Sequence, residues 1–318
     1  MTVPRIFALT ALCLCASLAH AAGFRLLDIP AGPDGPALHG AVWTPCAAPA
    51  EKITLAPVVI DGSWNCPIAG SRLPLVVISH GKGGSSLLHH DTAARLADAG
   101  FVVAAINHPG HNFQDMSGLG RLDVYATRPA DMRRLVDYML GAWPARAVLD
   151  ADRVGLFGFS AGGYTGLVVV GARPDFRLWL DRCELASTMP ACQALRRNEQ
   201  PAVPPRDRRI KAAVIVDPLS AFDAAGLQPV TVPVQLWASA FGGDGVAPEA
   251  VEAVHRNLPT PPEWHPVPGS AHFAFIAPCT PVMAQALREI CSDPPGFDRA
   301  VFHAEFNTQV LDFFRKYF

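Results

Sequence analysis

Residues 158–163 read Gly-Phe-Ser-Ala-Gly-Gly, a G-x-S-x-G motif followed by a further glycine. Residues 153–157 before it, apolar after Arg153, predict a buried strand, and residues 164–170 after it can continue as a helix. A serine at such a strand-to-helix turn is forced out onto an exposed apex, and the flanking glycines allow strand and helix to approach closely. The helix N-terminus would face any anion that forms there. The segment therefore predicts a nucleophile elbow centred on Ser160.

Size and composition favour one large α/β domain. The chain has 318 residues, of which 50% are hydrophobic and 17% charged, enough to bury a large core. We expect residues 23–318 to form this single domain. A net charge of −2 and the lack of a basic stripe with interleaved aromatic residues argue against a nucleic-acid partner. The expected partner is a small molecule.

The first 22 residues have the pattern of a secretory signal peptide. Arg5 provides a basic start, residues 6–18 are apolar, and Ala19-His20-Ala21 is a small-x-small cleavage site. The apolar run is too short for a membrane span, for which about 20 residues are needed. We therefore expect a protein that is exported to the periplasm or secreted, with no membrane span.

The cysteines fit an exported protein. Without the two in the leader, six remain, an even number in an oxidising compartment. Nearest-neighbour pairing is one of fifteen possibilities and closes three short loops outside the predicted sheet. No C-x-x-C or H-x-x-x-H spacing occurs, so we expect neither a metal nor another cofactor. The candidate pairs are Cys46 with Cys66, Cys183 with Cys192, and Cys279 with Cys291.

Strand-like and helix-like segments alternate through most of the chain, which predicts a mostly parallel, doubly wound sheet flanked by helices. Two segments interrupt the pattern. Residues 45–72 are rich in proline and predict an excursion from the sheet that a disulfide closes. Residues 172–208 follow the nucleophile helix and predict either a cap over the active site or a surface excursion.

A glycine-rich loop follows the strand predicted for residues 73–79. It reads His80-Gly81-Lys82-Gly83-Gly84, and ligands bind at such strand ends in open α/β sheets. We expect the backbone N–H groups of Lys82 and Ala161 to form an oxyanion hole. His108, at the end of the next predicted strand, is a possible pocket residue.

Ser160 needs a base and an orienting acid, because a hydroxyl group is a weak nucleophile at its own pKa. His272 follows the last predicted strand in a Gly-Ser-Ala-His turn and is the expected base. Asp244 and Asp217 follow the two strands before it. Asp244 is preferred, because the strand before it is the more common origin of the acid, and Asp217 remains the alternative.

These motifs, in this order, resemble an α/β-hydrolase, specifically the bacterial dienelactone-hydrolase-like group related to platelet-activating-factor acetylhydrolases. The resemblance covers the chain from about Leu73 onward. It implies a mostly parallel sheet of about eight strands and metal-free ester hydrolysis through an acyl-enzyme. Dienelactone hydrolases proper have cysteine in place of Ser160, and the acetylhydrolase branch takes its acid from the strand that matches Asp217.

The expected function is therefore hydrolysis of a small carboxylic ester through a Ser-His-Asp triad. Two alternatives remain from the sequence. A peptidase or an acyltransferase can use the same triad, and a non-catalytic binding protein can be built on the same scaffold.

Overall fold

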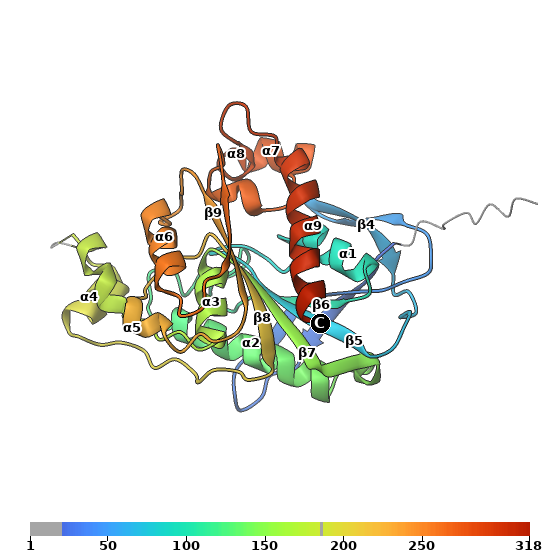
Figure 1. Ribbon diagram of the computed structural model, residues 1–318, viewed down its shortest axis with the longest axis horizontal. Helices are drawn as coiled ribbons and strands as arrows, with labels where there is room; N and C mark the ends of the chain where they lie inside the picture. The colour runs from blue at the N-terminus through green and yellow to red at the C-terminus, as the bar shows by residue number, and fades with distance from the viewer. Residues whose placement is uncertain (1–20, 185–186) are drawn as a thin grey trace, which may run out of the picture.

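The computed structural model describes residues 21–184 and 187–318. Residues 1–20 of the expected signal peptide lie outside the described residues. Helices cover both faces of a twisted central sheet (Figure 1). No helix in the described ranges is long and apolar enough to cross a membrane.

Among the described residues, the sheet has ten strands in the order β10-β9-β8-β7-β5-β6-β2-β1-β4-β3. The six strands from β10 to β6 in this order run parallel, and β2 is antiparallel to both of its neighbours. Strands β3 and β4 form an antiparallel pair, and β4 also pairs with β1. The strands are β1 Gly23–Ile29, β2 Leu38–Thr44, β3 Glu51–Leu55, β4 Val58–Trp64, β5 Leu73–Ser79, β6 Val102–Ile106, β7 Leu149–Phe159, β8 Ile210–Val216, β9 Val234–Ser239 and β10 Glu263–Val267.

Two apolar layers bury the sheet. Helices α2 and α3 pack in the core on one face, together with α6, whereas α1 and α9 pack on the other face. Every residue of β5 and β6 is buried, which explains their almost continuous apolar sequence. The helices are α1 His90–Asp98, α2 Val124–Gly141, α3 Ala161–Val169, α4 Pro190–Arg196, α5 Ala224–Leu227, α6 Pro248–Asn257, α7 Pro281–Ala286, α8 Arg288–Cys291 and α9 Arg299–Tyr317, with 3₁₀ segments η1 Arg146–Val148, η2 Phe176–Arg182 and η3 His272–Phe275.

The parallel, doubly wound sheet predicted from the sequence is confirmed, but the sheet is larger than the eight strands implied by the resemblance. Residues 45–72 are not an excursion outside the sheet, because they contain β3 and β4. Ile53, Val58 and Ile60 of this hairpin point into the core, which is why the segment joins the sheet. Cys46 and Cys66 bond near the two ends of the hairpin.

The three disulfides within the described ranges connect nearest neighbours along the chain, and they are the three candidate pairs named from the sequence. The Cα–Cα distances are 6.0 Å for Cys46–Cys66, 5.6 Å for Cys183–Cys192 and 5.9 Å for Cys279–Cys291, within the range that a disulfide requires.

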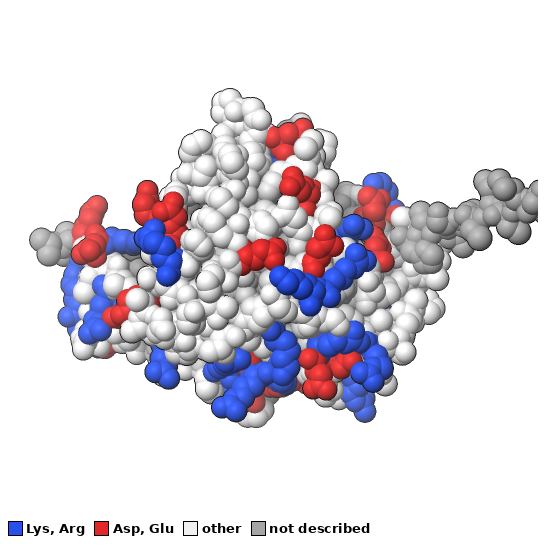
Figure 2. Space-filling view, in the orientation of Figure 1, with Lys and Arg blue, Asp and Glu red and all other residues white. Residues whose placement is uncertain are grey.

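Charged side chains of both signs are interspersed on the face seen in Figure 2. They gather along its lower part, at its left side and right of the centre, and an area left of the centre carries few of them. The visible face therefore has no continuous stretch of one sign.

Candidate active site

Ser160 lies at the turn between β7 and α3, in a backbone conformation that L-residues rarely adopt, with φ of 57° and ψ of −119°. Glycine is required on both sides of the turn: a Cβ at Gly158 would overlap the Gly162 carbonyl, and one at Gly162 would overlap the Ser79 carbonyl. The Ser160 N–H donates to the Val216 carbonyl at 2.9 Å, which ties the turn to β8. The strand, sharp turn and helix expected for this segment are therefore present, with Ser160 held at the carboxyl edge of the sheet.

His272 opens η3, just beyond β10, and its ring is buried. It stacks on Phe159, the residue before the serine, with ring centroids 4.7 Å apart. Its Nδ1 lies 2.6 Å from Asp217 Oδ2, whereas its buried Nε2 has no hydrogen-bond partner among the described residues. Ser160 and His272 line the same cavity. The histidine thus has one nitrogen held by a carboxylate and one free to act.

The structure pairs His272 with Asp217, not with the preferred Asp244. Asp217 follows β8 and is fully buried, and its carboxylate also accepts bonds from the Ser239 amide at 3.0 Å and the Ser239 hydroxyl at 2.8 Å. Asp244 follows β9, in a tight turn that directs its carboxylate to the Lys82 ammonium group. Turn geometry separates the two acids, although both stand after adjacent strands.

The two amides expected to bind an oxyanion belong to Ala161, which directly follows the serine, and to Lys82 of the glycine-rich loop. Ala161 is the first residue of α3, so its N–H has no carbonyl partner within the helix. In the described part of the chain, the Lys82 N–H donates no hydrogen bond either. A Cβ on Gly81, the neighbour of Lys82, would lie 3.3 Å from the Ser160 Cβ, so this loop closes against the serine.

The structure is similar along almost its whole length to a solved enzyme. A ferulic acid esterase from Streptomyces cinnamoneus superposes with a TM-score of 0.66 over 95% of this chain and 91% of the other, at 20% sequence identity. Residues 71–204 match the family described as serine aminopeptidase, S33. The chain belongs to the α/β-hydrolase superfamily.

Curated relatives match this α/β-hydrolase over shorter segments. A platelet-activating factor acetylhydrolase from Cavia porcellus is 34% identical over 58 residues, which are 18% of this chain and 13% of that protein. The corresponding protein of Canis lupus familiaris is 40% identical over 52 residues, 16% of this chain and 12% of the relative. A probable 2-oxo-3-(5-oxofuran-2-ylidene)propanoate lactonase from Bradyrhizobium sp is 31% identical over 106 residues, 32% of this chain and 42% of that protein. The matched part therefore spans less than half of each relative.

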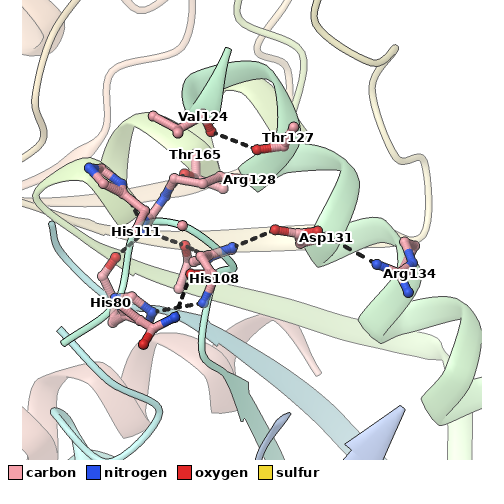
Figure 3. A network of polar contacts seen from close by, with 12 residues as sticks. His80, His108, His111, Val124, Thr127, Arg128, Asp131, Arg134 and Thr165 are labelled. Atoms are coloured by element: carbon pink, nitrogen blue, oxygen red, sulfur yellow. Dashed lines mark hydrogen bonds and ion pairs between the residues drawn. The ribbon is translucent and has the colours of Figure 1, made fainter. Parts of the chain in front are cut away.

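A buried polar network holds the glycine-rich loop of this α/β-hydrolase in place (Figure 3). Arg128 of α2 is fully buried and donates to the His80 carbonyl and to Thr165 Oγ1, the latter at 3.1 Å. The His80 ring bridges the Gly81 carbonyl at 2.6 Å and the His108 N–H at 3.1 Å. Because His80 Nε2 accepts from that amide, its Nδ1 must carry the proton. The network fixes the backbone from which the Lys82 amide projects.

His108 belongs to this network and does not line the cavity. Its ring is fully buried, with Nε2 2.9 Å from Ser79 Oγ and Nδ1 3.1 Å from Asp131 Oδ2. The turn after β6 directs the ring toward Ser79 and Asp131 instead of into the cavity. The geometry therefore does not support the pocket role expected for His108. The role of Arg128 in this network was not predicted from the sequence, because an Arg-Pro pair in a helix matches no known functional motif.

Burial dominates the electrostatics of the network. It lowers the pKa of His80 and of His108 well below the usual histidine value, and the neighbouring Arg128 lowers both further. The pKa of His111, beside the same arginine, falls to about 3, again mainly through burial. Burial lowers the pKa of Arg128 to about 10 and raises that of Asp131 to about 7. The histidines are therefore neutral around a charged guanidinium group at pH 7.

The cavity in front of Ser160 has a volume of about 580 Å³. Its walls come from β1, β2, the β3–β4 turn, the glycine-rich loop and the segment that contains α7 and α8. Thr280 Oγ1 donates to the Pro57 carbonyl at 3.1 Å, which links that segment to the β3–β4 turn. Apolar side chains dominate the walls: Leu26, Leu27, Leu55, Val58, Leu87, Leu88, Phe113, Phe159, Phe273, Ile276, Met283, Leu287 and Ile290.

The segment 172–208 contributes no lining residue in its described part. It instead contacts the turn that carries Asp244, where Arg182 donates to the Gly245 carbonyl at 3.1 Å. No group of His, Cys, Asp and Glu in the described ranges is arranged to hold a metal ion.

Proposed function

We propose that the protein is an exported serine hydrolase of carboxylic esters. One observation carries the proposal. His272 is bonded to Asp217 through Nδ1, and its buried Nε2 has no hydrogen-bond partner among the described residues. His272 also lines the same cavity as Ser160. A nucleophile, a base and an acid that holds the base are the parts that acyl transfer requires.

In the proposed mechanism, His272 Nε2 takes the Ser160 hydroxyl proton as Oγ attacks the ester carbonyl carbon. The Lys82 and Ala161 amides bind the resulting oxyanion, and Asp217 stabilises the imidazolium ion. Collapse of the intermediate expels the alcohol, which takes its proton from His272, and leaves an acyl-enzyme. Water, activated by the same histidine, then releases the acid.

The apolar walls favour a small ester with an apolar acyl or alcohol group. Three disulfides support export, because such bonds persist in oxidising compartments. The lactonase relative makes a strained cyclic ester a second substrate class to assay.

Hydrolysis of p-nitrophenyl acetate, butyrate and octanoate by the purified mature protein tests the proposal, with Ser160→Ala as the control. We expect turnover that falls at least about a thousandfold in the variant, which should keep its melting temperature. Turnover that survives in Ser160→Ala would reject the nucleophile, and no turnover of any ester would favour the binding-protein alternative.

The S33 match raises an aminopeptidase as a second candidate. Such an enzyme needs a carboxylate for the substrate's ammonium group, but the two aspartates that line the cavity, Asp28 and Asp244, are paired with His39 and Lys82. We therefore expect alanine p-nitroanilide to be hydrolysed far more slowly than p-nitrophenyl butyrate.

A further inference from the structure

Lys82 and Asp244 form an ion pair beside the candidate catalytic residues. Lys82 comes from the loop after β5 and Asp244 from the loop after β9, and both line the cavity together with Ser160 and His272. Their side chains are 37% and 23% exposed, so the pair stands where cavity and solvent meet. The mechanism proposed above uses the Lys82 amide but neither of these two side chains.

Two backbone hydrogen bonds close the turn that carries Asp244. Gly243 and Val246 exchange two backbone hydrogen bonds of 2.9 Å each, with Asp244 and Gly245 between them at φ of 48° and 84°. Positive φ at both central positions defines a type I′ turn, for which Asp-Gly is a preferred sequence. The conformation of the chain itself therefore sets the position of the Asp244 carboxylate.

This turn is also anchored to its surroundings. The His272 N–H donates to the Gly242 carbonyl at 2.9 Å, and Arg182 Nη1 donates to the Gly245 carbonyl at 3.1 Å. The carboxylate thus holds a defined place relative to the candidate base, opposite the Lys82 ammonium group.

The ion pair determines the charge balance of the cavity. Among the described residues, Lys82 is the sole lysine or arginine in the lining. The other lining aspartate, Asp28, is bonded to His39, with Oδ1 and Nδ1 2.6 Å apart. Asp244 therefore cancels the one permanent positive charge in a largely apolar cavity. Without it, an unpaired ammonium group would stand in the same cavity as Ser160 and His272.

We propose that Asp244 is a specificity-determining residue that neutralises Lys82 and restricts the site to esters without a charge near the scissile bond. The proposal rests on the ester hydrolysis proposed above. An anionic substrate meets the Asp244 carboxylate and finds no free cation, and burying its charge unpaired is costly. An uncharged apolar ester does not pay this cost when it enters the cavity.

A pair of esters with the same acyl length tests this proposal. p-Nitrophenyl butyrate is uncharged, whereas mono-p-nitrophenyl succinate carries a carboxylate at the end of a four-carbon acyl chain. The measured quantity is the ratio of kcat/KM for the succinate to kcat/KM for the butyrate. We expect the wild type to prefer butyrate and Asp244→Asn to raise the ratio about tenfold, the scale of one gained charge pair.

Asparagine is a suitable substitution, because it has the shape of aspartate and tolerates positive φ. Asp244→Gly, which also tolerates this backbone, should raise the ratio equally. The double variant Lys82→Met with Asp244→Asn should return it toward the wild-type value, since no cation remains. High salt should reduce the gain of Asp244→Asn, because the pair is partly exposed.

The outcomes separate this proposal from the proposed function. A ratio that stays at the wild-type value in both Asp244 variants, while butyrate turnover still requires Ser160, would overturn the specificity role alone. A ratio that rises equally in the double variant would overturn the role of Lys82. Absent butyrate turnover, or turnover that persists in Ser160→Ala, would count against ester hydrolysis itself.

Discussion

At the scale of single residues, the two acids near the site have different partners and should respond differently to mutation. Asp217→Asn removes the charge bonded to His272 Nδ1 and permits the wrong ring tautomer, so kcat should fall about 10⁴-fold. Asp244→Asn should lower butyrate turnover far less. Steady-state kinetics on both variants, with melting curves as the folding control, checks this expectation, and a larger loss in Asp244→Asn would reverse the assignment of the acid.

Ser160 and His272 could be proposed from the sequence, because each stands in a local motif whose backbone shape follows from its glycines. The sequence was not enough to choose the acid. Asp217 and Asp244 follow consecutive strands, and only the turn after each strand decides where the carboxylate points. Asp244 turns toward Lys82, whereas Asp217 lies against Ser239 and His272.

Arg128 should be important for stability, because its buried guanidinium group donates hydrogen bonds to several buried acceptors. Arg128→Lys keeps the charge but loses the planar fork, and leaves buried acceptors such as Thr165 Oγ1 and the His80 carbonyl without a donor. We expect a loss of about 2–4 kcal/mol in the free energy of unfolding. Urea denaturation measures it, with the exposed Arg121→Lys as a matched control that should change stability by less than about 0.5 kcal/mol.

At the scale of elements, the segment with α7 and α8 forms a wall of the cavity, and the disulfide Cys279–Cys291 closes that segment. Replacing both cysteines with serine should loosen the wall formed by residues such as Met283 and Ile290. We expect long acyl chains to contact more of this wall than short ones, so KM should rise more for p-nitrophenyl octanoate than for the acetate.

The disulfide Cys183–Cys192 offers the matched control, because its segment contributes no lining residue within the described ranges. Its double serine variant should lose stability but keep the wild-type order of chain-length preference. An equal change of preference in the two double variants would mean that the α7–α8 segment does not determine chain length.

One element that was not predicted from the sequence is the β3–β4 hairpin. Its segment is short and rich in proline, and in β3 only Ile53 is fully buried. A strand with one inward side chain gives almost no alternating pattern, whereas β5 and β6, buried throughout, were recognisable as continuous apolar runs. The hairpin matters for the site, because its turn contributes Leu55 and Val58 to the cavity.

At the scale of the whole molecule, parallel strands bring the distant parts of the site together. Ser160, Asp217 and His272 follow β7, β8 and β10, whose carboxyl ends meet at one edge of the sheet. The network beneath the glycine-rich loop could not be foreseen, because its members come from four segments, the loops after β5 and β6 and the helices α2 and α3, whose relative placement depends on how the helices pack on the sheet.

Buried histidines make the folded state as a whole sensitive to acid. The ring of His89 is buried between Phe157 and Phe159, with centroid distances of 4.9 and 5.4 Å, and burial lowers its pKa to about 3. Below about pH 6.5 the unfolded chain binds a proton there that the folded chain does not bind until about pH 3. Stability is therefore lost as the pH falls through this window, by at most about 1.4 kcal/mol per pH unit for this one group.

His89→Phe should make the acid loss of stability less steep, because phenylalanine suits the aromatic surroundings and does not titrate. Other groups with shifted pKa values, such as His108 and Asp131, titrate in both proteins, so the difference between the two curves isolates His89. Urea denaturation of wild type and variant at several pH values between 4 and 7 measures that difference. It should grow in favour of the variant as the pH falls, whatever its value at pH 7, and two parallel curves would show that His89 is protonated in the folded protein as readily as in the unfolded chain.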